Sequence, residues 1–178
     1  MDQNYRGLLL RGRTAAGKSQ VAIIAGQKRL HIAEGATFAG AVAAARAHVD
    51  AMFAESAVRR RAKNIGTVDE YVRFFAANPP REHHAKLLKA HSKRPMTMTQ
   101  LAAVAGWDGY KEVNANYGSL EAEIGRTLGL AFDRRVDDTE FFMSSIVEQL
   151  DANDPRTDHA LFEMHPEVAE ALRIIGLV

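Results

Sequence analysis

The segment Thr97–Leu130, TMTQLAAVAGWDGYKEVNANYGSLEAEIGRTLGL, decides the fold of the second half of this chain. Its first part predicts a short helix, because Thr97 or Thr99 can cap exposed backbone N–H groups. The apolar side chains of this helix recur three and four residues apart, at Leu101, Val104 and Ala105.

The segment Gly106–Gly109 then predicts a tight turn, because glycine accepts the positive φ that a chain reversal needs. A longer second helix follows. Its predicted apolar stripe consists of Val113, Tyr117, Leu120, Ile124 and Leu128. Two helices joined by such a turn are typical of a helix-turn-helix unit, whose second helix can enter the DNA major groove. A packed helical hairpin without DNA contact has the same pattern.

Composition limits the classes of protein to consider. The chain has 178 residues, 47% of them hydrophobic, and no cysteine, which excludes disulfides and thiolate chemistry. No apolar run approaches the roughly 18 residues of a membrane span, and no signal-peptide pattern is present. These features predict a cytoplasmic protein with no membrane partner.

The net charge of +1 hides a strong asymmetry between the two halves. Residues 1–100 contain 17 Lys and Arg against 7 Asp and Glu, whereas residues 101–178 contain 6 against 15. Such asymmetry indicates binding to nucleic acid or to a charged partner. The alternative is that the halves attract each other or a second copy of the chain, which would give a homodimer.

The N-terminal region predicts a small sheet with one helix. Three strands are expected at Tyr5–Leu10, Gln20–Ala25 and Lys28–Ile32, followed by a helix from about Phe38 to Ala57. We therefore expect an α+β fold, in which residues 1–58 form a three-stranded antiparallel sheet with one helix.

The rest of the chain predicts a second domain. Residues 59–67 are expected to be a basic linker, and residues 68–178 a mostly helical, winged-helix-like domain. Helices are expected at 68–77, 81–92, 139–150 and 166–175 besides the pair described first, with a strand at 160–164.

Residues 69–178 resemble an uncharacterised helix-turn-helix module of bacterial, phage and plasmid proteins that is sometimes fused to HNH-type restriction endonucleases. The segments that carry this resemblance are Leu101–Trp107, Tyr110, Asn114–Leu120 and Met164–Leu172. Two features depart from the family pattern: Gly176-Leu177-Val178 replaces an expected aromatic residue, and the segment 131–158 is unusually acidic. The resemblance implies a DNA-associated role and no settled activity.

Three groups of residues are candidates for contact with double-stranded DNA. Side chains early on the second helix can reach base edges, and cations can neutralise phosphates. The base-contact candidates are Lys111, Asn114, Asn116 and Ser119. The phosphate candidates form two groups: Arg59, Arg60, Arg61 and Lys63 in the basic linker, and Lys86, Lys89, Lys93 and Arg94 around the helix before the turn. Glu112, Glu121 and Glu123 share the second helix and would repel phosphate.

The segment Gly12–Ser19, GRTAAGKS, matches the phosphate-binding P-loop pattern. That chemistry requires a helix directly after the motif, whereas Val21–Ala25 is rich in β-branched residues. A hairpin loop is therefore the favoured interpretation, and nucleotide binding is a minor alternative.

We expect no catalytic, metal or cofactor site. The seven histidines lack metal-ligand spacing, so we interpret them as surface or capping residues, with His165 at a strand-to-helix corner. The carboxylates Asp133, Asp137, Asp138 and Glu140 are expected to form a solvated acidic loop, with a cation site or a surface for a basic partner as the alternatives.

Two hypotheses of function follow. The first is a non-enzymatic DNA-binding protein of a phage or mobile element, regulatory or defence-related. The second is a protein-interaction inhibitor of a host nucleoprotein defence complex, acting through the acidic C-terminal half.

Overall fold

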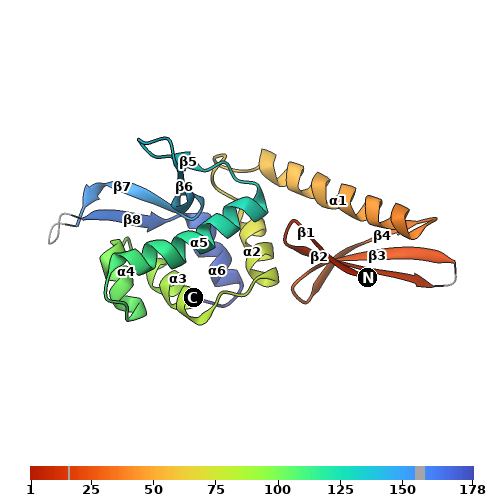
Figure 1. The fold of residues 1–178 in the computed structure, drawn as a ribbon, viewed down its shortest axis with the longest axis horizontal. Helices are drawn as coiled ribbons and strands as arrows, with labels where there is room; N and C mark the ends of the chain where they lie inside the picture. Colours follow the sequence, from red (N-terminus) through yellow and green to blue (C-terminus); the bar gives the residue numbers. More distant parts are fainter. Residues whose placement is uncertain (16, 155–158) are drawn as a thin grey trace. The chain divides into compact units, whose positions relative to one another are not determined.

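The computed structural model describes residues 1–15, 17–154 and 159–178. The fold is α+β, as predicted, and the chain divides into two compact units (Figure 1). The first contains Met1–Arg59 and Arg73–Pro79, and the second contains Arg60–Val72 and Pro80–Val178, so the division falls within α2 (Val68–Ala77). None of the helices in the described ranges is long and apolar enough to cross a bilayer.

The first unit is built on a four-stranded antiparallel sheet, so the prediction of three strands is wrong. The strands are β1 (Asp2–Tyr5), β2 (Leu8–Ala15), β3 (Lys18–Ala25) and β4 (Lys28–Gly35), in the order β1-β2-β3-β4. Arg6 and Gly7, with φ of 48° and 73°, form the turn between β1 and β2. Positive φ at both central residues defines the tight hairpin turn that fits strand twist. Arginine is a poor signal for that turn, so the sequence predicts one strand where two exist.

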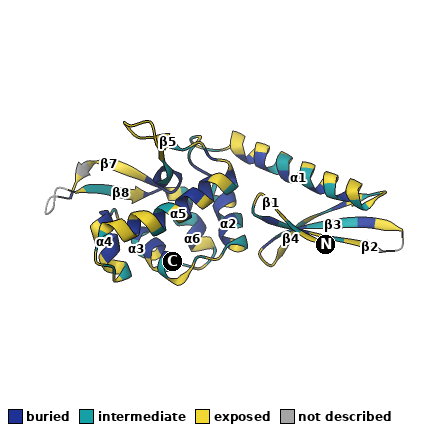
Figure 2. Ribbon diagram, viewed as in Figure 1, coloured by how far each residue is buried: buried dark blue, intermediate teal, exposed yellow. Residues whose placement is uncertain are grey.

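Helix α1 (Phe38–Val58) packs on one face of this sheet. Thr37 caps it by accepting a hydrogen bond from the N–H of Gly40 at 3.1 Å. A Cβ on Gly35 would lie 2.4 Å from the backbone nitrogen of Ala41, so β4 meets α1 at a point where only glycine fits. The apolar side chains buried between helix and sheet include Ala41, Ala45, Val49 and Phe53 of α1 and Leu10, Val21, Ile23 and Ala33 of the sheet (Figure 2).

The second unit is organised around α5 (Tyr110–Leu128). The other helices are α3 (Glu82–His91), α4 (Met98–Ala105) and α6 (Pro166–Ile174). The predicted stripe of α5 is confirmed, since all five of its residues are buried. Val104 of α4 is 40% exposed, so its assignment to the apolar face is wrong.

Residues 133–164 differ most from expectation. They form β5 (Asp133–Arg134), β6 (Glu140–Phe141), the 3-10 helix η1 (Phe142–Ser145), β7 (Val147–Asn153) and β8 (Ala160–Met164). The predicted helix at 139–150 is therefore wrong, whereas helices still predominate in residues 68–178. Two small antiparallel sheets, β5-β6 and β7-β8, take the place of that helix because long-range strand pairing outweighs local helix propensity.

The α4–α5 corner has the local signals that the sequence contains. Thr97 and Gln100 form a reciprocal capping box at the start of α4, and Gly106 ends it in the left-handed region at φ 74°. Gly109 is the N-cap of α5. Met96, directly before α4, pairs with Phe162 of β8 through two backbone hydrogen bonds of 3.0 and 3.1 Å. This pairing fixes the start of α4 beside the β7-β8 hairpin.

Candidate nucleic-acid interface

One side of α5 faces solvent, and no carboxylate lies along its centre. Positions three and four apart on this side include Lys111, Asn114, Ala115, Ser119 and Arg126, all of them exposed. Lys111 and Arg126 stand near opposite ends of the helix, roughly 22 Å apart at 1.5 Å per residue. We call this side the outer face of α5.

The three glutamates of α5 lie elsewhere. Glu121 is fully buried. Glu112 and Glu123 are exposed but lie roughly a quarter turn from the centre of the outer face, at 100° per residue. Glu112 also falls in the first turn, where the helix dipole favours an acidic side chain. The expected repulsion of phosphate is therefore displaced from the outer face.

The four predicted base-contact residues are not equally free. Lys111 and Asn114 are exposed, and neither makes a side-chain hydrogen bond with another described residue. The amide of Asn116 donates to the carbonyl of Glu112 at 2.9 Å, and the hydroxyl of Ser119 donates to the carbonyl of Asn116 at 2.8 Å. Asn116 is only partly exposed, which leaves Lys111, Asn114 and Ser119 as the side chains best placed to meet a ligand.

The predicted basic cluster at 59–63 is divided by its contacts. Arg60 pairs with Glu70 at 2.6 Å, with side chains 7% and 0% exposed, and it also donates to the carbonyl of Leu128. Arg61 pairs with Glu167 at 2.9 Å. Arg60 thus serves the core of the second unit and is unavailable to phosphate.

Five of the predicted phosphate contacts are both exposed and outside any ion pair among the described residues. They are Arg59, Lys63, Lys89, Lys93 and Arg94. Lys93 and Arg94 precede α4. The carbonyl of Lys63 accepts from the N–H of Ala131 at 3.0 Å, which places Lys63 near the C-terminal end of α5.

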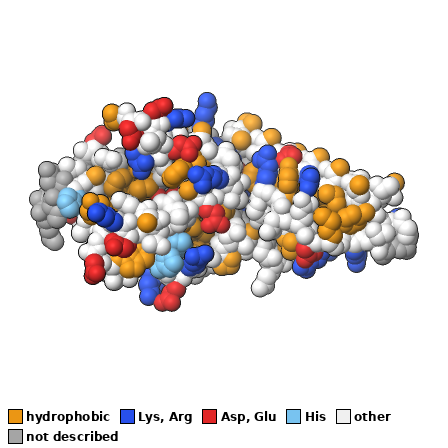
Figure 3. Space-filling model, viewed as in Figure 1, with side chains coloured by type: hydrophobic (Ala, Val, Ile, Leu, Met, Phe, Trp, Pro, Cys, Tyr) orange, Lys and Arg blue, Asp and Glu red, His pale blue; other side chains and the backbone are white. Residues whose placement is uncertain are grey.

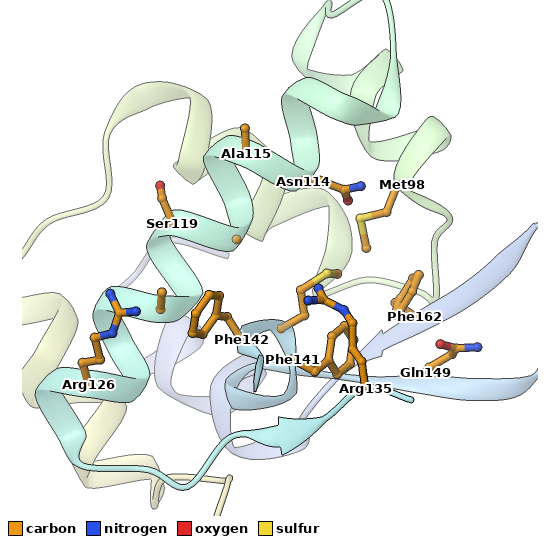
Figure 4. A pocket seen from close by; sticks show the side chains of 13 residues that line it. Met98, Asn114, Ala115, Ser119, Arg126, Arg135, Phe141, Phe142, Gln149 and Phe162 are labelled. Carbon is orange, nitrogen blue, oxygen red and sulfur yellow. The ribbon is translucent and has the colours of Figure 1, made fainter. Parts of the chain in front are cut away.

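A groove of about 570 Å³ runs beside the outer face of α5 (Figure 4). One wall is α5 itself, where Ala115, Gly118 and Ala122 keep the surface low. The opposite wall comes from the segment between β5 and β7, and Met98 and Phe162 lie at one end. The residues of the opposite wall are Arg135, Phe141, Phe142, Met143 and Gln149.

Two arginines lie against aromatic rings in this groove. Arg126 lies over the ring of Phe142, 5.0 Å from its centroid, and Arg135 over the ring of Phe141, at 5.3 Å. In the space-filling view, hydrophobic side chains are exposed in this part of the second unit beside Lys and Arg side chains (Figure 3). These aromatic residues are not among the predicted site residues, because the sequence predicts a helix at 139–150.

No protein-family model, curated protein or solved structure matches this chain. The resemblance to a helix-turn-helix module therefore stays a prediction, and function has to be inferred from the geometry.

The acidic cluster at 133–140 is an internally bonded hairpin. Asp133 accepts from the amide of Asn64 at 3.0 Å, and Asp138 pairs with Arg134. The hydroxyl of Thr139 donates to Asp137 at 2.6 Å, which lowers the pKa of that carboxyl. Arg134 and Arg135 lie within the same hairpin, so it is less acidic than its carboxylates alone suggest.

The P-loop-like segment lies in the hairpin between β2 and β3. Gly12 pairs with Val21 and Thr14 with Ser19 across this antiparallel pair, and Ala16 lies outside the described residues. Lys18 and Ser19 begin a strand, whereas a phosphate-binding loop requires a helix there.

Three histidines are buried rather than at the surface, which corrects their interpretation. Nε2 of His84, His91 and His165 lies 3.1, 2.9 and 3.1 Å from the carbonyls of Asn116, Phe162 and Ser144, respectively. Burial lowers the pKa of each imidazole. His165 does lie at the corner between β8 and α6, as predicted. Within the described ranges, no three His, Asp or Glu side chains are grouped to hold a metal ion.

Proposed function

We propose that this chain is a non-enzymatic DNA-binding protein that presents the N-terminal half of α5 to the major groove. The observation that carries the proposal is the outer face of α5, which bears Lys111, Asn114 and Ser119 and has no carboxylate along its centre. The exposed Glu112 and Glu123 lie at its edge. A helix fits the major groove, and asparagine and lysine are suited to the edges of adenine and guanine. Lys93 and Arg94 would contact phosphate at the start of α4.

A regulatory or defence-related role in a phage or mobile element is part of this proposal, and it is supported by the sequence resemblance alone. The inhibitor hypothesis gains less support, because Asp137 and Asp138 are bonded within the hairpin and Asp133 is bonded to Asn64. The nucleotide-binding alternative lacks the strand-to-helix geometry that it needs.

The test is a salt-titrated fluorescence-anisotropy assay with blunt duplex DNA. Each phosphate contact contributes about 0.9 to the slope of log K against log salt. We therefore expect the double variant Lys93→Ala, Arg94→Ala to lower that slope by about 2. Lys111→Ala removes a base contact and should weaken binding by about 1–3 kcal/mol.

The matched control is Arg173→Ala, which removes one exposed charge from an ion pair within α6. It should leave both affinity and slope unchanged. Binding that is undetectable at low salt, or that all three variants reduce equally, would remove the proposal.

A further inference from the structure

The groove beside α5 is lined by positively charged side chains and by no carboxylate. Residues 101–178 contain 15 Asp and Glu but only 6 Lys and Arg. Nevertheless, two of those six cations, Arg126 and Arg135, line the groove, and none of its lining residues is acidic. A groove that excludes carboxylates in the acidic half of the chain is complementary to an anion.

The groove also offers flat apolar surfaces. Phe141, Phe142 and Phe162 are all partly exposed along it, and the small side chains of α5 leave room above the helix. Phe141 and Phe162 have ring centroids 6.4 Å apart, so they form one aromatic wall with no space between them for a ligand. A planar ligand would stack on this wall. It would either displace the guanidinium of Arg135 from the ring of Phe141 or lie beside it.

Polar groups complete the recognition set. The amide side chains of Asn114 and Gln149 line the groove from α5 and β7, respectively. Amides present both donors and acceptors, which suits the edge of a nucleobase. Aromatic faces, arginines and amides with no carboxylate together describe a site for a planar base attached to a phosphate.

The length of the groove favours a strand over a free nucleotide. At Met98 and Phe162 it continues into a second hollow of about 400 Å³, which Tyr110 also lines. The Tyr110 side chain is 50% exposed and could stack a further base. The first hollow, of about 570 Å³, already lies in the range of roughly 300–1,000 Å³ that holds one drug-sized ligand, so the second hollow offers space for a further unit of a strand.

We propose that this groove binds unpaired nucleotides of a DNA strand, so that α5 recognises DNA with single-stranded character. The proposal rests on the proposed function and narrows its substrate. Phe142 lies beside the last turns of α5 through its contact with Arg126, so only the N-terminal half of the helix is open to a duplex. Asn114 and Ser119 of that half also line the groove, so the duplex and its unpaired strand would meet there.

The experiment compares fluorescein-labelled oligo(dT), a blunt duplex and the same duplex with a single-stranded tail. Base–aromatic stacking contributes enough that Phe141→Ala should weaken oligo(dT) binding about tenfold, with blunt-duplex binding unchanged within about twofold. Phe141→Tyr should retain strand binding. Gln149→Glu, at an exposed position of β7, should also weaken strand binding by adding a negative charge. Its matched control is Gln27→Glu, the same change at an exposed position of the first unit.

The outcomes separate the two proposals. If the blunt duplex binds and oligo(dT) does not, or if Phe141→Ala and Gln149→Glu affect both equally, the groove proposal is overturned and duplex binding survives. If neither the duplex nor oligo(dT) binds, the groove proposal and the proposed function are both overturned. Equal competition by dTMP would assign the groove to a free nucleotide, and equal competition by polyglutamate would assign it to an acidic protein segment. Either result would overturn the assignment to a DNA strand.

Discussion

Arg60 and Glu70 form an ion pair that is almost removed from solvent. The carboxylate of Glu70 also accepts a hydrogen bond from the N–H of Thr67 at 2.8 Å, while the hydroxyl of Thr67 accepts from the N–H of Glu70 at 3.3 Å. This reciprocal pattern is a capping box at the start of α2. Arg60 also reaches the carbonyls at the end of α5. One buried carboxylate thus ties the start of α2 to the end of α5.

We predict that Glu70→Gln lowers the free energy of unfolding by about 3 kcal/mol, because it leaves the Arg60 guanidinium buried without its counter-ion. Glutamine keeps an oxygen that can accept the capping hydrogen bond. The loss of unfolding free energy therefore measures the effect of removing the negative charge. The measurement is urea unfolding at pH 7. The control Glu167→Gln breaks the more exposed pair with Arg61 and should cost less than about 1 kcal/mol. Equal losses in the two variants would contradict this account.

At the residue level, the sequence predicts which side chains of α5 face outward, because helical periodicity is local. It does not predict that Arg60 is buried, since Arg60 stands in a run of three arginines that is typical of a solvated segment. The contacts that bury it come from Glu70, Leu128 and Gly129. Contacts between residues so far apart in the chain cannot be predicted from the local sequence pattern.

The corner between α4 and α5 depends on one backbone conformation. Gly106 has φ of 74°, and no other group would lie within 4 Å of an added Cβ. We therefore predict that Gly106→Ala destabilises the protein by about 1 kcal/mol through backbone strain alone. Gly118→Ala is the matched control, because Gly118 lies inside α5 and also has open space. That change should stabilise the protein by about 0.5–1 kcal/mol. Thermal unfolding that shows the same sign for both would refute the argument.

Elements with strong local signals were predicted well. Helix α2 has the bounds expected from its sequence, and the strand at 160–164 is present as β8. The segment 139–150 was misassigned because its apolar residues fit a helix as well as a strand, and pairing of Val147 with Met164 decides between them. The aromatic wall of the groove depends on that pairing, so this half of the site could not be found from sequence.

Over the whole molecule, the buried titratable groups with shifted pKa values lie mainly in the second unit and act in opposite directions. Burial raises the pKa of Glu121, whose carboxyl oxygens have no hydrogen-bond partner in the described part of the chain. A raised folded pKa favours the protonated acid, so its stabilising contribution is lost as the pH rises above the unfolded value of 4.5. The lowered pKa values of His84, His91 and His165 favour the neutral imidazole, so their contribution is lost as the pH falls below 6.5.

These opposing effects overlap between pH 4.5 and 6.5, and they should partly cancel in the native chain. We predict that Glu121→Met removes the contribution of the glutamate and leaves that of the three histidines. At pH 7 and above the variant should be more stable than the native protein, because methionine fills the site without an unsatisfied carboxyl. Its advantage should shrink as the pH falls and reach a minimum below pH 4.5, where the glutamic acid is protonated in both states. The stability of the variant should fall more steeply with acid, because only the histidines then titrate with folding. Hydrogen exchange at pH 5 would place this loss in the second unit, since the histidines of the first unit, His31 and His48, are exposed. Parallel stability curves for the variant and the native chain would show that Glu121 does not titrate with folding.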